Sequence, residues 1–116
     1  MIPTTADSRH SLTTGGEYMY ARLTTLSFHI EKYDEGVRIF DQSVVPAARA
    51  QKGFRAIYLL ADRQSGRCVA LSFWDDEAVA VANEQNLYYQ DQLVKLLPFY
   101  ASPPVREGYE VVVESR

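Results

Sequence analysis

The chain has 116 residues, of which 47% are hydrophobic, 12% aromatic and 23% charged. This is enough apolar material for one domain with its own core, and too much for a disordered chain. The net charge is -3 and the basic residues are scattered singly among acids, which argues against the basic stripe that nucleic acid requires. The sequence therefore predicts a single domain over residues 18–116 that does not bind nucleic acid.

The N-terminal segment MIPTTADSRHSLTTGGE is rich in Thr, Ser and Gly and has few large apolar side chains. Such a segment cannot offset the entropy cost of being ordered, so residues 1–17 are predicted to form a flexible tail. His10 lies in this tail and is given no role.

Cellular location is indicated by what the chain does not contain. No apolar run approaches the roughly 20 residues that span a bilayer, and the N-terminus lacks the pattern of a signal peptide. Cys68 is the only cysteine and lies in an apolar run, where a thiol typically behaves as a small buried hydrophobe. These features favour a cytoplasmic protein that has no contact with a membrane.

A strand and a helix are predicted in the first half of the chain. The segment YARLTTLSFHI, from Tyr20, carries apolar residues on both alternating faces, as a strand covered on both sides does. The segment KYDEGVRIFDQSVVPAARAQKGF has apolar residues three and four apart and predicts a helix with Asp34 as its N-cap. Pro46 predicts a kink or restart. Gly53 suits a left-handed cap, so the helix should end just before Phe54.

A hairpin, a second helix and a last strand follow. Two strand-like runs, 54–61 and 67–74, flank DRQSG, whose Asp, Ser and Gly favour a turn. The segment DDEAVAVANEQNLYYQDQLVKLLPFY begins with acids, continues at helical spacing and predicts one helix that is terminated by Pro98. After ASPP, the segment VREGYEVVVES predicts a strand with Tyr109, Val111 and Val113 on one face.

The predicted order of elements is strand, helix, strand, strand, helix, strand. This is the α+β ferredoxin-like β-α-β-β-α-β arrangement, with an antiparallel sheet and both helices on one of its faces. Neither face of the strands is polar, as Leu26, Phe28, Leu59 and Phe73 illustrate, so the face without helices is expected to be covered. A homodimer joined through this sheet face is the expected assembly.

Three segments carry a family resemblance: VVPAARAQKGF, then DRQSGRCVALSFWDDEAVAVA, then VREGYEVVV. A Pro and a Gly-Phe pair close the first helix, and a Gly hairpin leads to a strand that ends in Trp74 and an acid. With these marks, from about Tyr20 to Val113, the chain resembles the antibiotic biosynthesis monooxygenase family, a group of dimeric α+β barrels. The resemblance implies a cavity between sheet and helices. Some members oxygenate polycyclic aromatics without metal or flavin, and others degrade haem.

The sequence offers two catalytic candidates, and the resemblance implies the first of them. In the oxygenase and haem-degrading relatives a Trp at the end of the same strand lines the cavity, so Trp74 is a candidate; the alternative is that it plugs the core. His29, the only histidine inside the predicted fold, is the candidate general base, although a histidine at a strand end is more often exposed or structural. The haem-degrading relatives pair this Trp with a His about ten residues further on and an Asn on the first strand, and this chain has neither residue at those positions. Ala70 stands where oxygenase relatives have an Asn.

The candidate substrate-binding residues are polar side chains near the predicted cavity: Arg22, Tyr58, Asn83, Asn86 and Tyr89. Arg22 and Tyr58 would hold an anionic oxygen if they face the cavity, which the strand register decides. The two asparagines and Tyr89 would donate hydrogen bonds to an oxygenated ring; alternatively they are residues of a dimer rim.

Two functions stay open. The first is a cofactor-independent monooxygenase that acts on a hydroxylated aromatic or quinol-type small molecule, with no metal and no other cofactor. The second is a non-catalytic dimer of the same fold that binds a small ligand or has a structural role, and the missing partners of Trp74 support it. Haem degradation is the third and least supported function.

Overall fold

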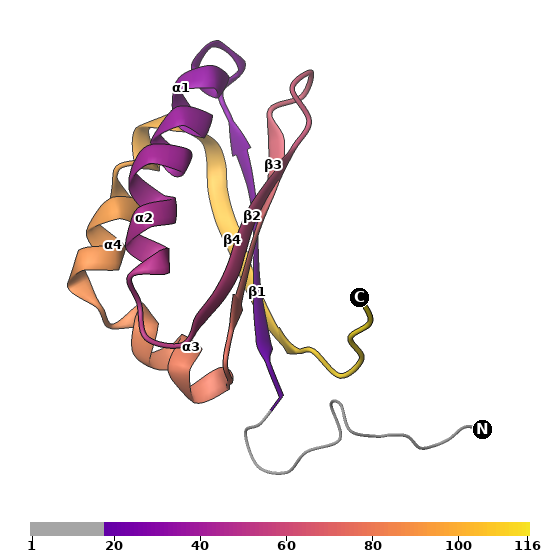
Figure 1. Ribbon diagram of the computed structural model, residues 1–116. Helices are drawn as coiled ribbons and strands as arrows, with labels where there is room; N and C mark the ends of the chain where they lie inside the picture. Colours follow the sequence, from indigo (N-terminus) through magenta and orange to yellow (C-terminus); the bar gives the residue numbers. More distant parts are fainter. Residues whose placement is uncertain (1–17) are drawn as a thin grey trace.

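The computed structural model describes residues 18–116; the predicted tail, residues 1–17, lies outside the described residues (Figure 1). Four strands form one antiparallel sheet in the order β2-β3-β1-β4, and the helices all lie on one of its faces (Figure 1). The strands are β1 (Tyr20–Phe28), β2 (Phe54–Ala61), β3 (Arg67–Trp74) and β4 (Tyr100–Glu110). This arrangement confirms the predicted α+β ferredoxin-like fold.

The first helical segment lies between β1 and β2 and is interrupted once. It consists of a 3-10 turn (Ile30–Lys32), α1 (Tyr33–Ile39), a π-helical segment η3 (Phe40–Val44) and α2 (Val45–Arg49). Pro46 has no N–H to donate to the preceding turn, so the helix widens to π geometry before it and restarts in α2, as predicted.

Two details of the first helix differ from prediction. Asp34 is not the N-cap, because the 3-10 turn begins directly after β1 and Lys32 precedes α1. The carboxylate of Asp34 instead accepts a hydrogen bond from Arg63 of the β2–β3 hairpin at 2.8 Å. The helix also ends at Arg49, earlier than expected, although Gly53 has the left-handed φ of 80° that was predicted for it.

The single helix predicted after Trp74 is wrong, since the structure has two: α3 (Glu77–Glu84) and α4 (Leu87–Val94). The Asn86 side chain accepts a hydrogen bond from the Tyr89 backbone N–H at 3.0 Å and so starts a new helix. The backbone of an N-cap residue is extended and not helical, and Asn86 has a ψ of 111°. The helical path is therefore broken at Asn86, and the chain changes direction between α3 and α4. A 3-10 turn (Leu97–Phe99) then leads to β4.

The last strand is longer at its start and shorter at its end than predicted. It begins at Tyr100, includes Pro103 and Pro104, and ends at Glu110, so that Val111 and Val113 lie beyond it. The prolines are tolerated because β4 is an edge strand and because its pairing with β1 shifts register between Ser102 and Val105, so that neither proline is paired with a residue of β1.

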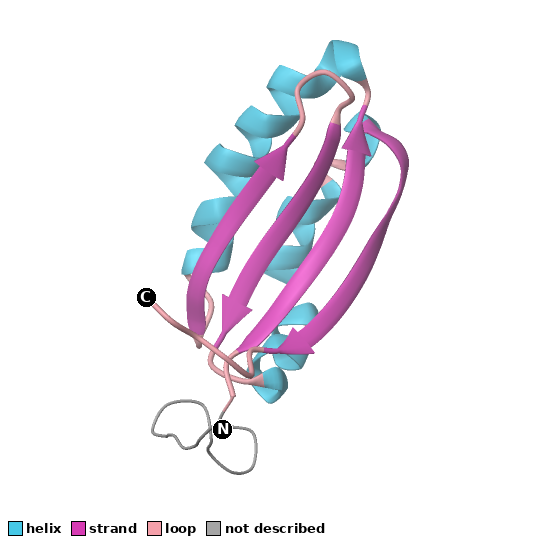
Figure 2. Cartoon of the chain, turned by 90° about the vertical axis from the view of Figure 1, so that its right-hand side faces the viewer, coloured by secondary structure: helices cyan, strands magenta, loops and turns pink. Residues whose placement is uncertain are grey.

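The strand register decides which side chains face the helices. Arg22 of β1 is opposite Ser72 of β3 and Gly108 of β4, and Thr24 is opposite Ala70 and Arg106. The alternate residues point to the other face, which no helix covers (Figure 2). Four large side chains of that open face are at least half exposed: Tyr58 at 54%, Leu60 at 52%, Val105 at 59% and Tyr109 at 54%.

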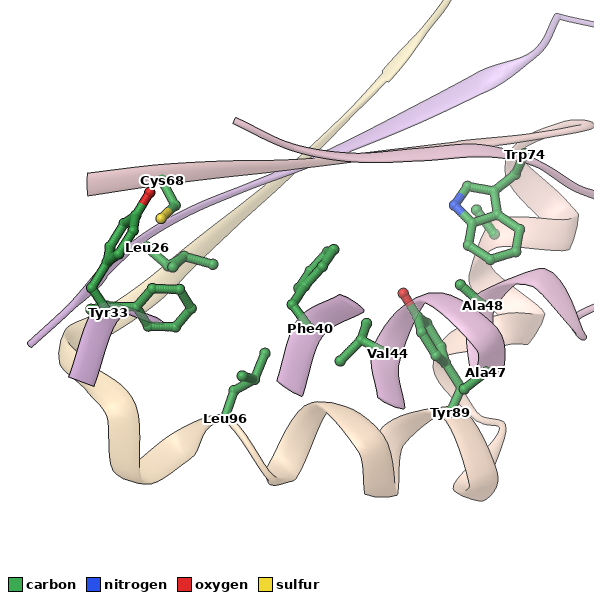
Figure 3. Close-up of a cluster of buried hydrophobic side chains, with 12 residues drawn as sticks. Leu26, Tyr33, Phe40, Val44, Ala47, Ala48, Cys68, Trp74, Tyr89 and Leu96 are labelled. Carbon is green, nitrogen blue, oxygen red and sulfur yellow. The ribbon is translucent and has the colours of Figure 1, made fainter. Parts of the chain in front are cut away.

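The core lies between the sheet and the helices (Figure 3). Trp74, Phe28, Leu96 and Val44 are its largest fully buried side chains. Trp74 lies at one end of this cluster and Cys68 at the other (Figure 3). Cys68 is buried, as predicted, and burial raises the pKa of its thiol.

None of the helices within residues 18–116 has the length and the apolar character that crossing a bilayer would require.

The hairpin between β2 and β3 depends on Gly66. This residue has a φ of 80°, and an added Cβ would overlap the carbonyl oxygen of Phe28. A Gly66→Ala change is therefore expected to lower the free energy of unfolding by about 2–3 kcal/mol, from left-handed strain and a backbone clash that no rotamer relieves. Urea unfolding measures this loss. Gln64→Ala, an exposed change in the same turn, should stay within about 0.5 kcal/mol of wild type, and an equal loss in both variants would contradict the explanation.

Candidate functional site

A cavity of about 380 Å³ lies between the sheet and the helical layer. This volume is in the lower part of the range of small-molecule pockets. Its apolar walls come from β1, β2 and β3, from η3 and from α4 to the start of β4: Leu26, Phe40, Val44, Ile57, Ala70, Leu71, Leu93, Val94, Leu96, Leu97, Tyr100 and Pro104. Its polar lining is Arg22, Thr24, Ser72, Tyr89, Gln90 and Arg106. The cavity therefore has apolar walls and a few convergent polar groups.

Arg22 provides a buried positive charge in this cavity. Its residue is only 7% exposed, and its Nη2 donates to the Ala80 carbonyl oxygen at 3.0 Å and to Glu84 Oε2 at 2.5 Å. Burial lowers the pKa of Arg22 and the carboxylate of Glu84 opposes that shift, so the guanidinium stays charged at neutral pH. These two contacts hold the side chain at the junction of β1 and α3.

Arg106 brings a second guanidinium to the same place from β4. Its Nη2 is 3.7 Å from Glu84 Oε1, so the two arginines share one carboxylate. Strand pairing explains the convergence, because Arg106 is opposite Thr24, two residues from Arg22 on the same face. Two positive charges and one negative charge thus meet at one end of the cavity.

Tyr89 of α4 supplies a phenol to the cavity. The residue is 6% exposed, and its hydroxyl points from the helix toward the sheet (Figure 3). Burial raises the pKa of Tyr89, and the charges of Arg22 and Arg106 oppose that shift only in part. The phenol is therefore neutral at physiological pH and is able to donate a hydrogen bond.

The raised pKa of Tyr89 predicts a dependence of stability on pH. A pKa that is higher in the folded than in the unfolded chain contributes stability that is present below about pH 10 and is lost as the pH rises through the folded value. The Tyr89→Phe variant should lose less stability than wild type between neutral and strongly alkaline pH, measured by urea unfolding. Tyr88→Phe, which changes an exposed side chain of the same helix, is the matched control; a Tyr89→Phe profile that coincides with wild type would contradict the prediction.

Trp74 lies behind the cavity wall. It is fully buried, its ring is edge-on to Phe54 at 5.8 Å between centroids and tilted against Tyr89 at 6.3 Å, and its Nε1–H donates to Ser72 Oγ at 2.9 Å. The described residues that line the cavity include Tyr89 and Ser72 but not Trp74. The structure thus places Trp74 where it supports two lining residues from behind.

His29 and Tyr58 lie away from the cavity. His29 directly follows β1, is exposed, and is seven residues from Arg22, which is about 20 Å along a strand. Tyr58 is on the open face of the sheet, where its ring is edge-on to Phe73 at 6.2 Å between centroids. Both placements follow from β geometry, because strand length separates His29 from Arg22 and strand alternation turns Tyr58 to the opposite face.

The two candidate asparagines are not among the described residues that line the cavity. Asn83 is 5% exposed, and neither polar atom of its side chain has a hydrogen-bond partner among the described residues. Asn86 is exposed and caps α4. Of the predicted site residues, the structure brings Arg22 and Tyr89 together at the cavity.

Sequence reasoning missed Arg106, Glu84 and Ser72. Arg106 shares its face of β4 with Gly108, and in the sequence it is separated from Arg22 by most of the chain. A weak signal existed, since Arg22 and Arg106 are each an isolated arginine in a strand segment rich in apolar and aromatic residues. Spacing alone does not pair such residues, because the strand neighbours are set by topology.

Several of the solved structures to which this structure is similar share one description. A chain described as "Putative antibiotic biosynthesis monooxygenase" from Caulobacter crescentus superposes with a TM-score of 0.73 at 17% identity, over 84% of this chain and 92% of that one. A chain with the same description from Nitrosomonas europaea gives a TM-score of 0.69 at 17% identity, over 85% and 94%. The chain therefore has the fold of the antibiotic biosynthesis monooxygenases, which confirms the resemblance at the level of the fold.

Sequence comparison leads to uncharacterised relatives. Uncharacterized protein Rv2557 of Mycobacterium tuberculosis is 33% identical over 102 residues, which cover 87% of this chain and 44% of that protein. Uncharacterized protein Rv2558 is 36% identical over 93 residues, covering 79% and 39%. The chain thus spans less than half the length of the curated relatives that it matches. No family model matches the chain.

Proposed function

We propose that the chain is a cofactor-independent monooxygenase that binds a hydroxylated aromatic molecule as its anion. The observation that carries the proposal is the meeting of Arg22, Arg106 and the neutral Tyr89 phenol in one apolar cavity. The shared fold with proteins described as antibiotic biosynthesis monooxygenases supports the reaction class.

The cavity suits an aromatic anion because its two kinds of wall act on different parts of the ligand. Leucine, valine and phenylalanine side chains remove the rings from water, and guanidinium and phenol donors meet an anionic oxygen. Nearby positive charge favours the ionised form of a phenol or enol and so lowers its pKa. No histidine is among the described lining residues, so we expect water, and not His29, to accept the released proton.

The substrate itself supplies the electrons in the proposed reaction. An enol or phenol O–H loses its proton, and the resulting anion transfers one electron to molecular oxygen. The substrate radical and superoxide then combine at a ring carbon, and the peroxide takes up a proton. Loss of water breaks the O–O and C–H bonds and leaves a carbonyl, so one ring CH₂ and one O₂ become C=O and H₂O. Arg22 and Arg106 hold the anion throughout this sequence and stabilise its charge.

Oxygen uptake by chelator-treated protein tests the proposal, with anthrones, quinols and polyphenols as substrates. At least one substrate should be consumed faster than it autoxidises, and Arg106→Gln should lower kcat/KM about tenfold because it removes a charged donor from the cavity. Arg63→Gln, an exposed change in the hairpin, is the matched control and should leave the rate unchanged. Uptake equal to autoxidation across the panel would reject the reaction.

The alternative function is a non-catalytic protein that binds a small aromatic anion. It is favoured by the position of His29 outside the cavity, since the described residues that line the cavity include no general base of the expected kind. Ligand-dependent thermal stabilisation together with an absence of oxygen uptake would select this function.

We also propose that a second copy of the chain covers the open face of the sheet. The half-exposed side chains of Tyr58, Leu60, Val105 and Tyr109 support this assembly, as does the resemblance to a family of dimeric barrels. Sedimentation equilibrium should give a dimer for the wild-type chain and a monomer for Leu60→Glu. Lys52→Glu, which places the same charge in the turn before β2, should stay dimeric, and a monomeric wild-type chain would reject the proposal.

A further inference from the structure

The charged side chains at the cavity carry more positive than negative charge. The described lining residues include two arginines, Arg22 and Arg106, and no acid. Glu84 contacts both guanidiniums from α3 but does not itself line the cavity. It therefore neutralises one of the two positive charges and leaves a net charge of about +1 beside the ligand.

The place of Glu84 in its helix is unfavourable in isolation. It is the last residue of α3, and a carboxylate at a helix C-terminus is repelled by the helix dipole. The contact with Arg22, at 2.5 Å, offsets this repulsion, and Arg22 also donates to the Ala80 carbonyl oxygen of the same helix. Glu84 is thus better explained by its contact with the two arginines than by the stability of the helix.

We propose that Glu84 is the residue that determines the charge of the ligand: it holds Arg22 and Arg106 and limits the cavity to molecules with a single negative charge. This inference rests on the proposed binding of an aromatic anion. A monoanion would balance the residual charge, whereas a dianion would leave one buried negative charge without a partner. A neutral aromatic would leave the arginine donors without an anion. Glu84 acts through the arginines and is a positioning residue.

Binding of three ligands of equal shape tests the proposal by calorimetry at neutral pH. These are naphthalene-2,3-dicarboxamide, 3-carbamoyl-2-naphthoate and naphthalene-2,3-dicarboxylate, which carry charges of 0, -1 and -2. The wild-type chain should bind the monoanion roughly tenfold more tightly than either of the others. Glu84→Gln raises the net charge of the site to about +2, so the dianion should gain at least tenfold in affinity relative to the monoanion.

Two further variants separate charge from folding. Glu84→Asp keeps the carboxylate and should restore the preference for the monoanion, whereas Glu35→Gln, which changes an exposed side chain of α1, should leave the wild-type preference unchanged. The proposal is overturned if the dianion-to-monoanion ratio in Glu84→Gln stays within twofold of wild type, or if the wild-type chain binds none of the ligands. If the dianion-to-monoanion ratio shifts in Glu84→Gln but the wild-type chain takes up no oxygen with any substrate, the oxygenase function is rejected. The role of Glu84 in selecting the charge of the ligand would then still hold.

Discussion

An Arg22→Gln variant is expected to bind the monoanion 3-carbamoyl-2-naphthoate about 10- to 100-fold more weakly than the wild-type chain. Arg22 is buried at the cavity and presents a charged donor to it, and charge-assisted hydrogen bonds contribute about 1.5–3 kcal/mol. Glutamine keeps a donor that is able to reach neighbouring oxygens but removes the charge. The measurement is a calorimetric titration at neutral pH.

The fold of the Arg22→Gln variant should survive the change. Glu84 keeps its contact with Arg106 and is partly open to water, with a side-chain exposure of 34%, so it does not become a buried charge without a partner. Arg22→Lys keeps the charge without the planar fork and should recover part of the affinity. A folded Arg22→Gln variant with wild-type affinity would show that the ligand does not contact Arg22.

The second large effect is expected on stability and concerns Trp74. Trp74→Ala should lower the free energy of unfolding by about 3–5 kcal/mol, because the indole is fully buried against Phe54 and Tyr89 and its loss leaves a cavity in the core. Such a loss is a large part of the roughly 5–15 kcal/mol that stabilises a domain of this size. Thermal and urea unfolding measure it.

Trp74→Phe distinguishes a structural role from the catalytic role that the family resemblance implied. Phenylalanine keeps most of the packing and loses the hydrogen bond to Ser72, so the loss of stability should be smaller than in Trp74→Ala. Since Trp74 lies behind Tyr89, ligand affinity should change less than threefold. A folded Trp74→Phe variant that loses binding would mean that the indole contacts the ligand after all.

Much of the fold was predictable because the signals that define it are local. The hairpin depends on DRQSG, the restart in the first helix on Pro46, and the positive φ of Gly53 on the absence of a side chain. Each is a property of a few consecutive residues, and the order of the elements then limits the topology to very few arrangements.

The break between α3 and α4 was not predictable from periodicity. Apolar residues continue at helical spacing through the break, and only the capping hydrogen bond of Asn86 shows that a new helix begins there. Asn is common at N-caps but also occurs elsewhere, so its presence in the sequence does not show that a helix begins there. The hydrophobic pattern fits one continuous helix and two helices equally well, and the hydrogen bond of the Asn86 side chain decides for two.

The sequence by itself determined the class of fold, the strand that ends at Trp74 and the presence of an apolar core, because these depend on composition, periodicity and turn residues. Tertiary structure alone decided the site. The pairing of β1 with β4 brings Arg106 beside Arg22, and the packing of α3 on the sheet brings Glu84 to both. Strand alternation turns Tyr58 to the opposite face, and the length of β1 leaves His29 at the far end of the sheet. Register and packing join residues that are far apart in the chain, and no local pattern encodes which of them meet.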